Sequence, residues 1–444
     1  MNLTSSSLEN AIRVGEFAEL LLPVISAGLT SGAIHRVEFE IENGQNFSPR
    51  WLDDAQLYPK IFWRSRSGGS PVAAMGAVAE GTLEELENLL QCSDPGVRIF
   101  GGARFDEDRD SVKEWAGFSG SRFFIPRAEI IRSGASTRLA INFINGQTHA
   151  SDVSYWLAAI AAEERSVNPS VLTRWDQPNF STWAKTTTAA LQAFEGGEFS
   201  KVVLDRKSSM ELSQPVSPFA LTEILMAGAP ACFHFCFQPS PDSGGFLGAS
   251  PELLYRRIGR AIQSEAVAGT RPRSLDPSED ERLEFQLLEF SKEQLEHRLV
   301  VESLSESFKK LCLDFSCDEN PSVLKLARVQ HLRTALRGTL RKGVGDSAII
   351  AMLHPTPATC GSPSLIAKKF IARHEPFDRG WYAGPIGCVS GNESEFAVAI
   401  RSMHLRGKYL DVYAGAGIVP GSDPEREWSE LEDKISGVLH ILAS

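Results

Sequence analysis

The chain has 444 residues, of which 42% are hydrophobic, and it carries a formal net charge of −11. The apolar content is sufficient for a large core. The negative balance argues against nucleic-acid binding, because phosphate backbones are bound through basic patches. An acidic protein with an anionic ligand must instead place positive charge locally, through a metal ion or a few Lys and Arg side chains.

The cysteines and the N-terminus indicate a reducing compartment. Seven cysteines, an odd number, are scattered along the chain without a CxxC pair, so neither a disulfide framework nor a cysteine metal site is predicted. The N-terminus lacks a basic leader segment, and the apolar stretch from Leu20 to Leu29 is too short to cross a bilayer. We therefore expect a cytoplasmic protein that does not enter a membrane.

The N-terminal half, residues 1–190, carries no recognisable catalytic signature. Its apolar patterning nevertheless predicts a regular series of elements. Helices are predicted at 7–27, 82–91, 155–165 and 179–196, and strands at 33–41, 60–64, 97–105 and 121–131.

The second half contains more motifs. Its first strand places Lys201, Val203 and Asp205 on one face, and Pro424 occupies the favoured first position of a final helix. No GxGxxG motif follows a strand and no βαβ regularity is present, which favours a layered α/β fold with mixed or antiparallel sheets over a Rossmann sheet. Strands are predicted at 200–206, 231–237, 245–255, 395–405 and 408–413, a Gly-rich turn at 414–417, and helices at 279–310 and 425–442.

Glu252 is the first candidate for chemistry. It follows a Gly/Ser/Pro turn and precedes Leu253 and Leu254. Such turns present the next side chain to a cavity, and a carboxyl beside apolar residues has a raised pKa and can keep a proton to donate. The alternative interpretation is an ordinary surface acid after a turn.

Two helices carry pairs of glutamates. Glu293 and Glu296 are three residues apart on the long helix, and Glu427 and Glu430 are three apart on the final helix, with Lys434 four residues beyond Glu430. If the two helices face each other across a cleft, the carboxylates could share a Mg²⁺ ion, which takes one or two carboxylates plus water and substrate oxygens. The simpler alternative is an exposed pair of Glu430 and Lys434, worth about 0.3–0.5 kcal/mol.

Three further features could serve an anionic ligand. A buried Lys201 could act as a base, and Arg401 at the end of an alternating strand could bind a carboxylate with both arms of its guanidinium. The sequence from Gly415 to Gly417 would let backbone N–H groups approach an anion. Each also has a structural alternative: a solvated lysine, an arginine paired with a core acid, or a plain tight turn.

Taken together, these segments resemble the chorismate-utilising enzymes, a group that includes isochorismate, anthranilate, aminodeoxychorismate and salicylate synthases. Order and spacing agree across roughly residues 195–440, with only a loose match before that, around IFGGARF (99–105). The matching segments are KVVLDR (201–206), FLGASPELL (246–254), EAVAGTRPR (265–273), LEHRLVVE (295–302), VQHLRT (329–334), LHPTPATCG (353–361), EPFDRGWYAGPIG (375–387), FAVAIR (396–401) and YAGAGIVPGSDPEREWSELEDK (413–434).

The resemblance implies a fold and a domain organisation. The whole chain, 1–444, would form a single α/β domain of the α+β type, with two packed, mainly antiparallel sheets surrounded by helices. Residues 1–190 would be its variable N-terminal half and 195–440 its chorismate-binding catalytic half. Chorismate would be the partner, with no obligatory protein subunit.

The resemblance also implies roles for individual residues in a Mg²⁺-dependent isomerisation of chorismate to isochorismate. Lys201 would deprotonate a water molecule that attacks C2, and Glu252 would protonate the departing C4 hydroxyl. Metal ligands would be Glu296 and Glu430, with Glu293 and Glu427 acting through water. Substrate contacts would come from Gly269, Thr270, Tyr382, Arg401, Gly415 and Lys434, and His331 and His354 fall in family motifs.

Within the group, a few positions favour isochorismate synthase. Anthranilate synthases tend to have Gln where Lys201 stands, and aminodeoxychorismate synthases have a nucleophilic Lys at the position of Ala268. Ala358 is similar to isochorismate synthases, whereas Thr359 departs from their usual Leu or Val. The alternatives are a salicylate synthase, which adds pyruvate elimination, and an anthranilate synthase component I-like subunit, or a homologue that only binds.

Overall fold

The computed structural model describes residues 32–41, 47–109, 112–118, 120–144, 169–326 and 328–443. The helices predicted at 7–27 and 155–165 lie outside these ranges. Within the ranges, no helix combines the length and the apolar content needed to cross a bilayer.

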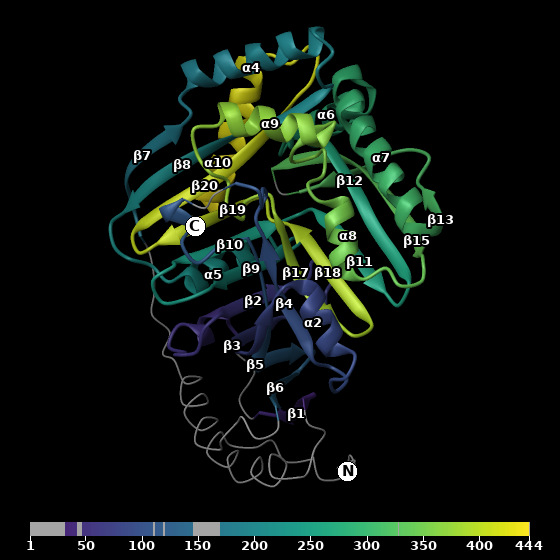
Figure 1. The fold of residues 1–444 in the computed structure, drawn as a ribbon. Coiled ribbons are helices and arrows are strands. Elements are labelled where there is room, and N and C mark those ends of the chain that lie inside the picture. The colour runs from purple at the N-terminus through teal and green to yellow at the C-terminus, as the bar shows by residue number, and fades with distance from the viewer. Residues whose placement is uncertain are drawn as a thin grey trace.

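Antiparallel strands form the frame of the molecule, and helices lie around them (Figure 1). Hydrogen bonds link the strands into one continuous network. This architecture confirms the predicted fold class, an α/β protein of the α+β type with mainly antiparallel strands. In the N-terminal part the elements are β1 (Ile34–Glu40), η3 (Pro49–Leu52), β2 (Lys60–Arg64), β3 (Val72–Gly81), α2 (Leu83–Leu90), β4 (Arg98–Ala103), η4 (Lys113–Trp115), β5 (Ser121–Ser133), β6 (Ser136–Ile144), β7 (Val171–Gln177) and α4 (Phe180–Glu195).

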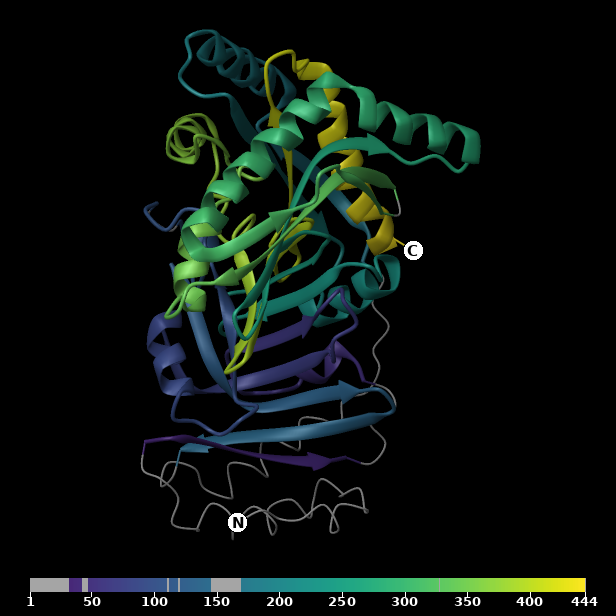
Figure 2. The ribbon, with the colours of Figure 1, turned by 90° about the vertical axis from the view of Figure 1, so that its right-hand side faces the viewer.

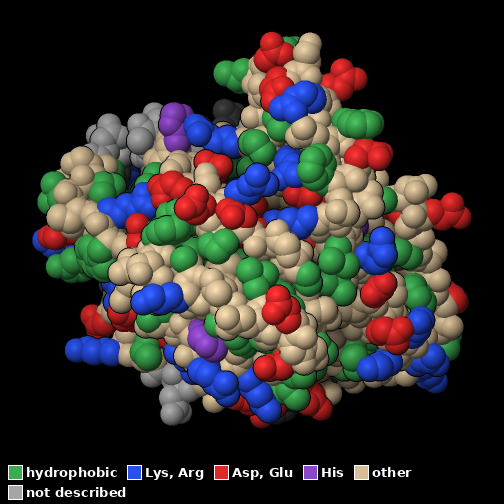
Figure 3. Space-filling view, turned by 90° about the horizontal axis from the view of Figure 1, so that it is seen from above, with side chains coloured by type: hydrophobic (Ala, Val, Ile, Leu, Met, Phe, Trp, Pro, Cys, Tyr) green, Lys and Arg blue, Asp and Glu red, His purple; other side chains and the backbone are tan. Residues whose placement is uncertain are grey.

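The C-terminal part carries the longer helices, which Figure 2 shows on the side opposite the N-terminal strands. Acidic and basic side chains are interspersed on the face that is seen from above (Figure 3). The elements of the C-terminal part are β8 (Lys201–Leu212), α5 (Pro218–Gly228), β9 (Phe233–Gln238), β10 (Gly245–Ser250), β11 (Leu253–Ile258), β12 (Ala261–Pro272), α6 (Pro277–Glu289), α7 (Ser291–Leu311), β13 (Cys312–Cys317), β14 (Ser322–Lys325), β15 (Val329–Leu340), α8 (Asp346–Leu353), β16 (Gly361–Ser362), α9 (Ser364–His374), β17 (Pro385–Ser390), β18 (Glu393–Val398), β19 (Ser402–Arg406), β20 (Tyr409–Ile418) and α10 (Pro424–Ala443).

Strand pairing joins the two parts of the chain directly. β2 pairs with β9, and β4 pairs with β17, in both cases antiparallel. Buried aromatic rings fill the space between them: Trp381 stacks on Phe237 with ring centroids 4.9 Å apart, and Phe118 meets Trp381 edge to face at 5.4 Å. The N-terminal strands therefore share a core with the strands that carry the motifs.

The predicted helix at 279–310 is wrong in one respect, because it is two helices. α6 ends at Glu289, α7 begins at Ser291, and Phe290 between them has an extended backbone with φ −75° and ψ 127°. The Phe290 ring lies 5.2 Å from the guanidinium of Arg271 on β12. The apolar pattern does not reveal this break, since no proline or glycine marks it.

The strand predicted at 395–405 is also interrupted. β18 ends at Val398 and β19 begins at Ser402, and Arg401 between them has a φ of 50°. A positive φ is uncommon for a residue with a side chain, and such conformations concentrate at functional sites. A similar interruption at Pro251 and Glu252 divides the strand predicted at 245–255 into β10 and β11.

The Gly-rich turn predicted at 414–417 is instead the continuation of β20. This strand runs to Ile418 and pairs with β8, so that Gly415 lies opposite Asp205 and Gly417 opposite Val203. A glycine inside a strand often marks a close approach by another group. Carboxylate oxygens of Asp205 and Glu296 approach Gly415 and Gly417 in this way.

Gly380 is expected to be essential for stability. Its φ is 56°, and a Cβ at this position would lie 2.0 Å from atoms of the buried Trp115 ring. We predict that Gly380→Ala lowers the free energy of unfolding by about 3 kcal/mol, from overpacking and backbone strain, as measured by urea unfolding.

Gly134→Ala is the matched control. Gly134 has a similar φ of 59°, but a Cβ at this position would have no atom within 4 Å, so it isolates the backbone cost of about 1 kcal/mol. Equal losses of unfolding free energy in the two variants would show that the contact with Trp115 does not destabilise Gly380→Ala.

Candidate active site

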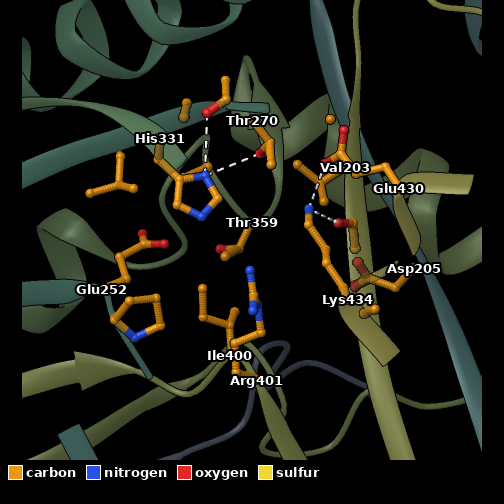
Figure 4. Close-up of a pocket in the computed structure, with 18 of the residues that line it drawn as sticks. Val203, Asp205, Glu252, Thr270, His331, Thr359, Ile400, Arg401, Glu430 and Lys434 are labelled. Carbon is orange, nitrogen blue, oxygen red and sulfur yellow. Dashed lines mark hydrogen bonds and ion pairs between the residues drawn. The ribbon is translucent and has the colours of Figure 1, made fainter. Parts of the chain in front are cut away.

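A pocket of about 720 Å³ lies where β8, β12 and β20 meet α7 and α10. Figure 4 shows polar side chains directed into it from several elements. The lining includes nine of the predicted site residues: Glu252, Gly269, Thr270, Glu296, Tyr382, Arg401, Gly415, Glu430 and Lys434.

Glu252 lies in the interruption between β10 and β11. Its N–H donates to Ser250 Oγ at 3.2 Å, and its carbonyl accepts from Val398 N at 3.1 Å, so the backbone is fixed on both sides. The side chain is buried. Burial raises the pKa of Glu252 to about 8, Lys201 opposes this, and the nearby Glu265 adds to it. At neutral pH the carboxyl therefore holds a proton, as predicted.

Lys201 lies directly behind the pocket wall, at the start of β8. Its side chain is fully buried, and Nζ is 3.1 Å from Oε1 of Glu296, a lining residue. A Cβ on Gly417 would lie 2.1 Å from this Glu296 oxygen and 3.3 Å from Lys201 Cε. The bare backbone of Gly417 thus makes room for the contact between the amine and the carboxylate.

The predicted glutamates on the two helices do approach each other. Glu430 forms an ion pair with Lys434 at 2.7 Å, and Glu427 forms one with Lys292. Burial, followed by repulsion from Glu430, raises the pKa of Glu427 to about 7, and Glu296 contributes in the same direction. The exposed surface pair considered from the sequence is excluded for Glu430, since its carboxylate lines the pocket.

Glu293 and Glu427 lie beside the pocket and not in its wall. Both line an adjoining cleft of about 2270 Å³, which shares Thr270 and Glu430 with the pocket. Glu293 Oε1 is 2.7 Å from Arg271, while its buried Oε2 has no hydrogen-bond partner among the described residues. They lie beyond Glu296 and Glu430, and the outer role predicted for them stays a prediction.

Arg401 brings positive charge to the other end of the pocket. Within the described ranges its guanidinium has neither an ion pair nor a hydrogen bond with another side chain, so the predicted alternative of a core acid partner is not found. Burial lowers the pKa of Arg401 from its ordinary value. Arg401 is half-buried, and a guanidinium partly removed from water without a carboxylate is costly unless a ligand anion completes it.

Three more of the predicted contact residues have defined partners in the pocket. Lys434 Nζ donates to the carbonyl oxygen of Gly415 at 2.8 Å, and the hydroxyl of Tyr382 lies 3.5 Å from Oδ1 of Asp205. A Cβ on Gly415 would lie 2.0 Å from the same Asp205 oxygen. Gly415 therefore accommodates a carboxylate of the protein itself, a function that the sequence did not predict.

The two histidines of the family motifs lie in different environments. His331 lines the pocket, and its Nδ1 lies 3.2 Å from the carbonyl of Gly269 and 3.1 Å from Thr270 Oγ1. Burial lowers the pKa of His331 to about 3. His354 instead packs against Phe105 outside the pocket lining, with Nε2 3.3 Å from the Phe105 carbonyl.

The sequence did not single out every residue of the wall as functional. Asp205, Val203 and Ile400 also line the pocket. The alternation of β8 already placed Asp205 and Val203 on the face of Lys201, which was the available signal. Ile400 could not be found in this way, because it depends on the backbone break at Arg401.

Comparison with known proteins agrees with this geometry. A family model described as chorismate binding enzyme matches residues 51–443. The chain is 32% identical over 406 residues to isochorismate synthase MenF of Escherichia coli (strain K12), covering 88% of this chain and 90% of that protein. It is 35% identical over 366 residues to isochorismate synthase 2, chloroplastic, of Arabidopsis thaliana, covering 79% of this chain and 65% of the relative.

Among solved structures, the fold is similar to MenF, the menaquinone-specific isochorismate synthase from Escherichia coli. The TM-score is 0.86 at 30% sequence identity, and the match covers 97% of this chain and 100% of that one. The chain belongs to the chorismate binding enzyme family.

Gly417 provides a test of the site that removes no functional side chain. We predict that Gly417→Ala lowers kcat/KM for chorismate by about 100-fold, because its Cβ displaces Glu296 from Lys201 and small displacements in an active site carry costs of this order. Steady-state kinetics and a thermal melt on the same preparation would measure the effect.

Gly391→Ala is the control, since no atom lies within 4 Å of a Cβ at that position. A Gly417→Ala enzyme with kinetics like those of Gly391→Ala would contradict the close approach at Glu296.

Proposed function

We propose that this protein is an isochorismate synthase, which isomerises chorismate to isochorismate by adding water at C2 and losing the C4 hydroxyl. The matches to isochorismate synthases over most of the chain support this reaction. The observation that carries the proposal is the buried Glu252 carboxyl, whose pKa of about 8 keeps it protonated at neutral pH in the family's pocket. We take residues 1–444 as one catalytic domain.

The reaction needs an acid and a base on opposite sides of the ring. Glu252 supplies the proton to the departing C4 hydroxyl, and Lys201 takes a proton from the water that attacks C2. Lys201 pairs with Glu296, and in the described part of the chain it has no ion pair with Glu252. This separation matters for the acid, because a direct pair with Lys201 would hold the Glu252 carboxyl ionised.

The other contacts would orient the substrate. Arg401, whose guanidinium has no ion pair among the described residues, would receive the enolpyruvyl carboxylate together with Tyr382, beside the Gly415 backbone and Lys434. Gly269 and Thr270 would contact the opposite edge of the ligand. The pocket offers the half-buried cations Arg401 and Lys434 in a protein of net charge −11, which satisfies the requirement for local cations.

We propose Mg²⁺ as the cofactor, held by Glu296 and Glu430 with Glu293 and Glu427 acting through water. The donor set fits a hard cation, since it consists of carboxylate oxygens. It also fits electrostatically, because Glu430 and Glu296 repel Glu427 enough to help raise its pKa to about 7. When bound, the ion would neutralise the ring carboxylate of chorismate.

The product and compartment are part of the proposal. Isochorismate would feed menaquinone or siderophore biosynthesis in the cytoplasm, and no protein partner would be required. Salicylate synthase stays the second candidate, because Thr359, which departs from the usual residue of isochorismate synthases, lies in the pocket wall.

The test is product identification with chorismate as sole substrate and Mg²⁺ present. We expect isochorismate by chromatography. Salicylate fluorescence without an added lyase would favour the second candidate, and ammonia-dependent anthranilate would point to a component I-like enzyme. Loss of the water reaction in Lys201→Ala would exclude a protein that only binds.

Glu252→Gln is expected to abolish turnover while chorismate binding is largely retained, because the amide cannot supply the proton. In the wild type, kcat should fall as the pH rises through about 8, since the pKa of Glu252 is raised and the acid form exists only below it. A Glu252→Gln enzyme with the wild-type rate would show that the proton donor is another group.

Glu430→Ala is expected to weaken the Mg²⁺ dependence. The apparent affinity for Mg²⁺, measured by titrating activity and by calorimetry without substrate, should fall by about tenfold or more. Glu425→Ala, which removes an exposed acid from the same helix, is the control. An identical metal titration for the two variants would remove Glu430 from the ligand set.

A further inference from the structure

Arg66 connects the N-terminal part of the chain to the segment that carries Glu252. It follows β2, which pairs with β9, and β9 in turn pairs with β10 (Figure 1). The side chain of Arg66 is 15% exposed. The proposed reaction assigns it no task, and it comes from the half of the chain in which the sequence shows no catalytic signature.

The side chain of Arg66 passes over β9 to reach its partners. Its guanidinium lies 5.2 Å from the centroid of the Phe233 ring, and the Trp63 ring stacks on Phe233 with centroids 5.8 Å apart. Phe233 lies opposite Ser250, the last residue of β10. The two rings therefore support Arg66 on its path toward the break between β10 and β11.

Regular strand pairing is interrupted at this break. The pairing of β10 with β9 ends at Ser250, and the pairing of β11 with β18 starts at Leu253. Arg66 Nη1 donates to the carbonyl oxygen of Pro251, which belongs to the peptide bond with Glu252. Pro251 is buried, and a buried backbone carbonyl needs such a partner. Arg66 thus holds the peptide unit that leads directly to the proton donor.

A second arm of the same guanidinium is anchored on a buried acid. Arg66 Nη2 lies 2.5 Å from Oε2 of Glu265 on β12, whose side chain is 2% exposed. A further cation, Arg333, is more distant from this carboxylate, with Nε 3.6 Å from Oε1. Because a guanidinium is planar and rigid, the ion pair with Glu265 also fixes the arm that binds Pro251.

Arg66 and Glu265 also act on Glu252 electrostatically. Burial is the largest cause that raises the pKa of Glu252, and Glu265 adds to it. Lys201, Arg66 and Lys434 oppose this rise. The cation and the anion of the ion pair therefore act on one carboxyl with opposite sign. The other charged residues and the histidine that line the pocket are Asp205, Glu296, His331, Arg401 and Glu430.

We propose that Arg66 is a positioning residue for the proton donor, because its guanidinium binds the Pro251 carbonyl and the Glu265 carboxylate together and so fixes the backbone from which Glu252 enters the pocket. The proposal rests on the proposed function, which gives Glu252 its task. Arg66 itself is not among the residues that line the pocket. Its loss should therefore affect turnover more than substrate binding.

The experiment compares Arg66→Ala, Arg66→Lys and Arg333→Ala by steady-state kinetics with chorismate. Arg66→Ala should lower kcat by at least about tenfold, since a misplacement of about 1 Å can cost about 100-fold. KM should change by less than about threefold, because the lost interaction serves the transition state. Arg66→Lys keeps a cation beside Glu265, but one ammonium does not reproduce the two-armed geometry, so most of the loss in kcat should persist.

Arg333→Ala is the matched control. It removes a cation from the same carboxylate, and no contact between Arg333 and Pro251 is found among the described residues. Its side chain is 33% exposed, so kcat should stay within about twofold of the wild type.

The pH profile of kcat is a readout that a merely structural role would not move. In the wild type, kcat should fall as the pH rises through the pKa of Glu252, about 8. Loss of the cation in Arg66→Ala should move this fall to higher pH, and loss of the anion in Glu265→Gln should move it to lower pH. Profiles that do not move in either variant would contradict the proposal.

The double variant Arg66→Ala/Glu265→Gln separates misplacement from misfolding. Arg66→Ala alone leaves the buried Glu265 carboxylate with only its more distant partner, which can destabilise the fold. The double variant has no such acid, and a thermal melt should show a more stable protein than Arg66→Ala. Its kcat should nevertheless stay within about threefold of that of Arg66→Ala, because both lack the hydrogen bond to Pro251.

Three further results would overturn the proposal. A wild-type kcat in Arg66→Ala would show that Glu252 is held in place without Arg66. Equal losses of kcat in Arg66→Ala and Arg333→Ala would show that only the charge around Glu265 matters. Full recovery of kcat in the double variant would show that the loss came from the unpaired acid and not from the contact with Pro251.

The proposed function is tested separately in the same set of proteins. Product formation by the wild type reports on the reaction, whereas the ratios between variants report on Arg66. If the wild type does not turn chorismate over, infrared spectroscopy can follow the protonated carboxyl band that is lost in Glu252→Gln. Its titration gives the pKa of Glu252 in each variant, and the absence of the two opposite shifts would overturn the proposal.

Discussion

The antiparallel register between β8 and β20 is the constraint on which the pocket depends. It sets Gly417 opposite Val203 and Gly415 opposite Asp205, so that β20 has no side chains where two carboxylates approach the strand. Since side chains alternate along a strand, a shift of one residue would turn Lys201 and Asp205 to the other face. The long ladder between the two strands holds this register, and α10 then adds Glu430 and Lys434 from above it.

Burial governs the charge states in the pocket more than any single ion pair does. It is the first cause that raises the pKa of Glu252, Asp205 and Glu427, and the first that lowers the pKa of His331 and Arg401. These three carboxyls and the imidazole are shifted toward neutral forms, while a guanidinium stays charged because its ordinary pKa is so high. Glu430 is the exception: burial acts to raise its pKa, but Lys434 beside it lowers the pKa below its ordinary value. The pocket is thereby less negative than its composition indicates. An acidic protein can in this way offer an anion a favourable environment.

The sequence predicted the fold class and nine of the residues that line the pocket, because those residues lie in motifs of fixed spacing. It placed Glu252 behind a turn, and Glu296 and Glu430 on two helices, and the structure brings these side chains to one pocket. What it could not predict depends on contacts between distant segments. The break at Phe290 has no local signal, and the reason for two glycines in β20 appears only when Asp205 and Glu296 are placed over them. The alternation of β8 pointed to Asp205 but gave no indication of its ion-pair partner Arg379, whose Nε is 2.7 Å from Asp205 Oδ2 and which lies 174 residues further along the chain.

The positive φ of Arg401 has a geometric consequence for molecular recognition. In a regular strand, consecutive side chains point to opposite faces, yet Ile400 and Arg401 both line the same cavity. The left-handed backbone conformation of Arg401 interrupts this alternation. The hydrocarbon side chain of Ile400 and the cation of Arg401 are therefore adjacent in the cavity wall. Two adjacent residues of a single chain segment can thus bind a small ligand that is flat and apolar in one part and anionic in the next.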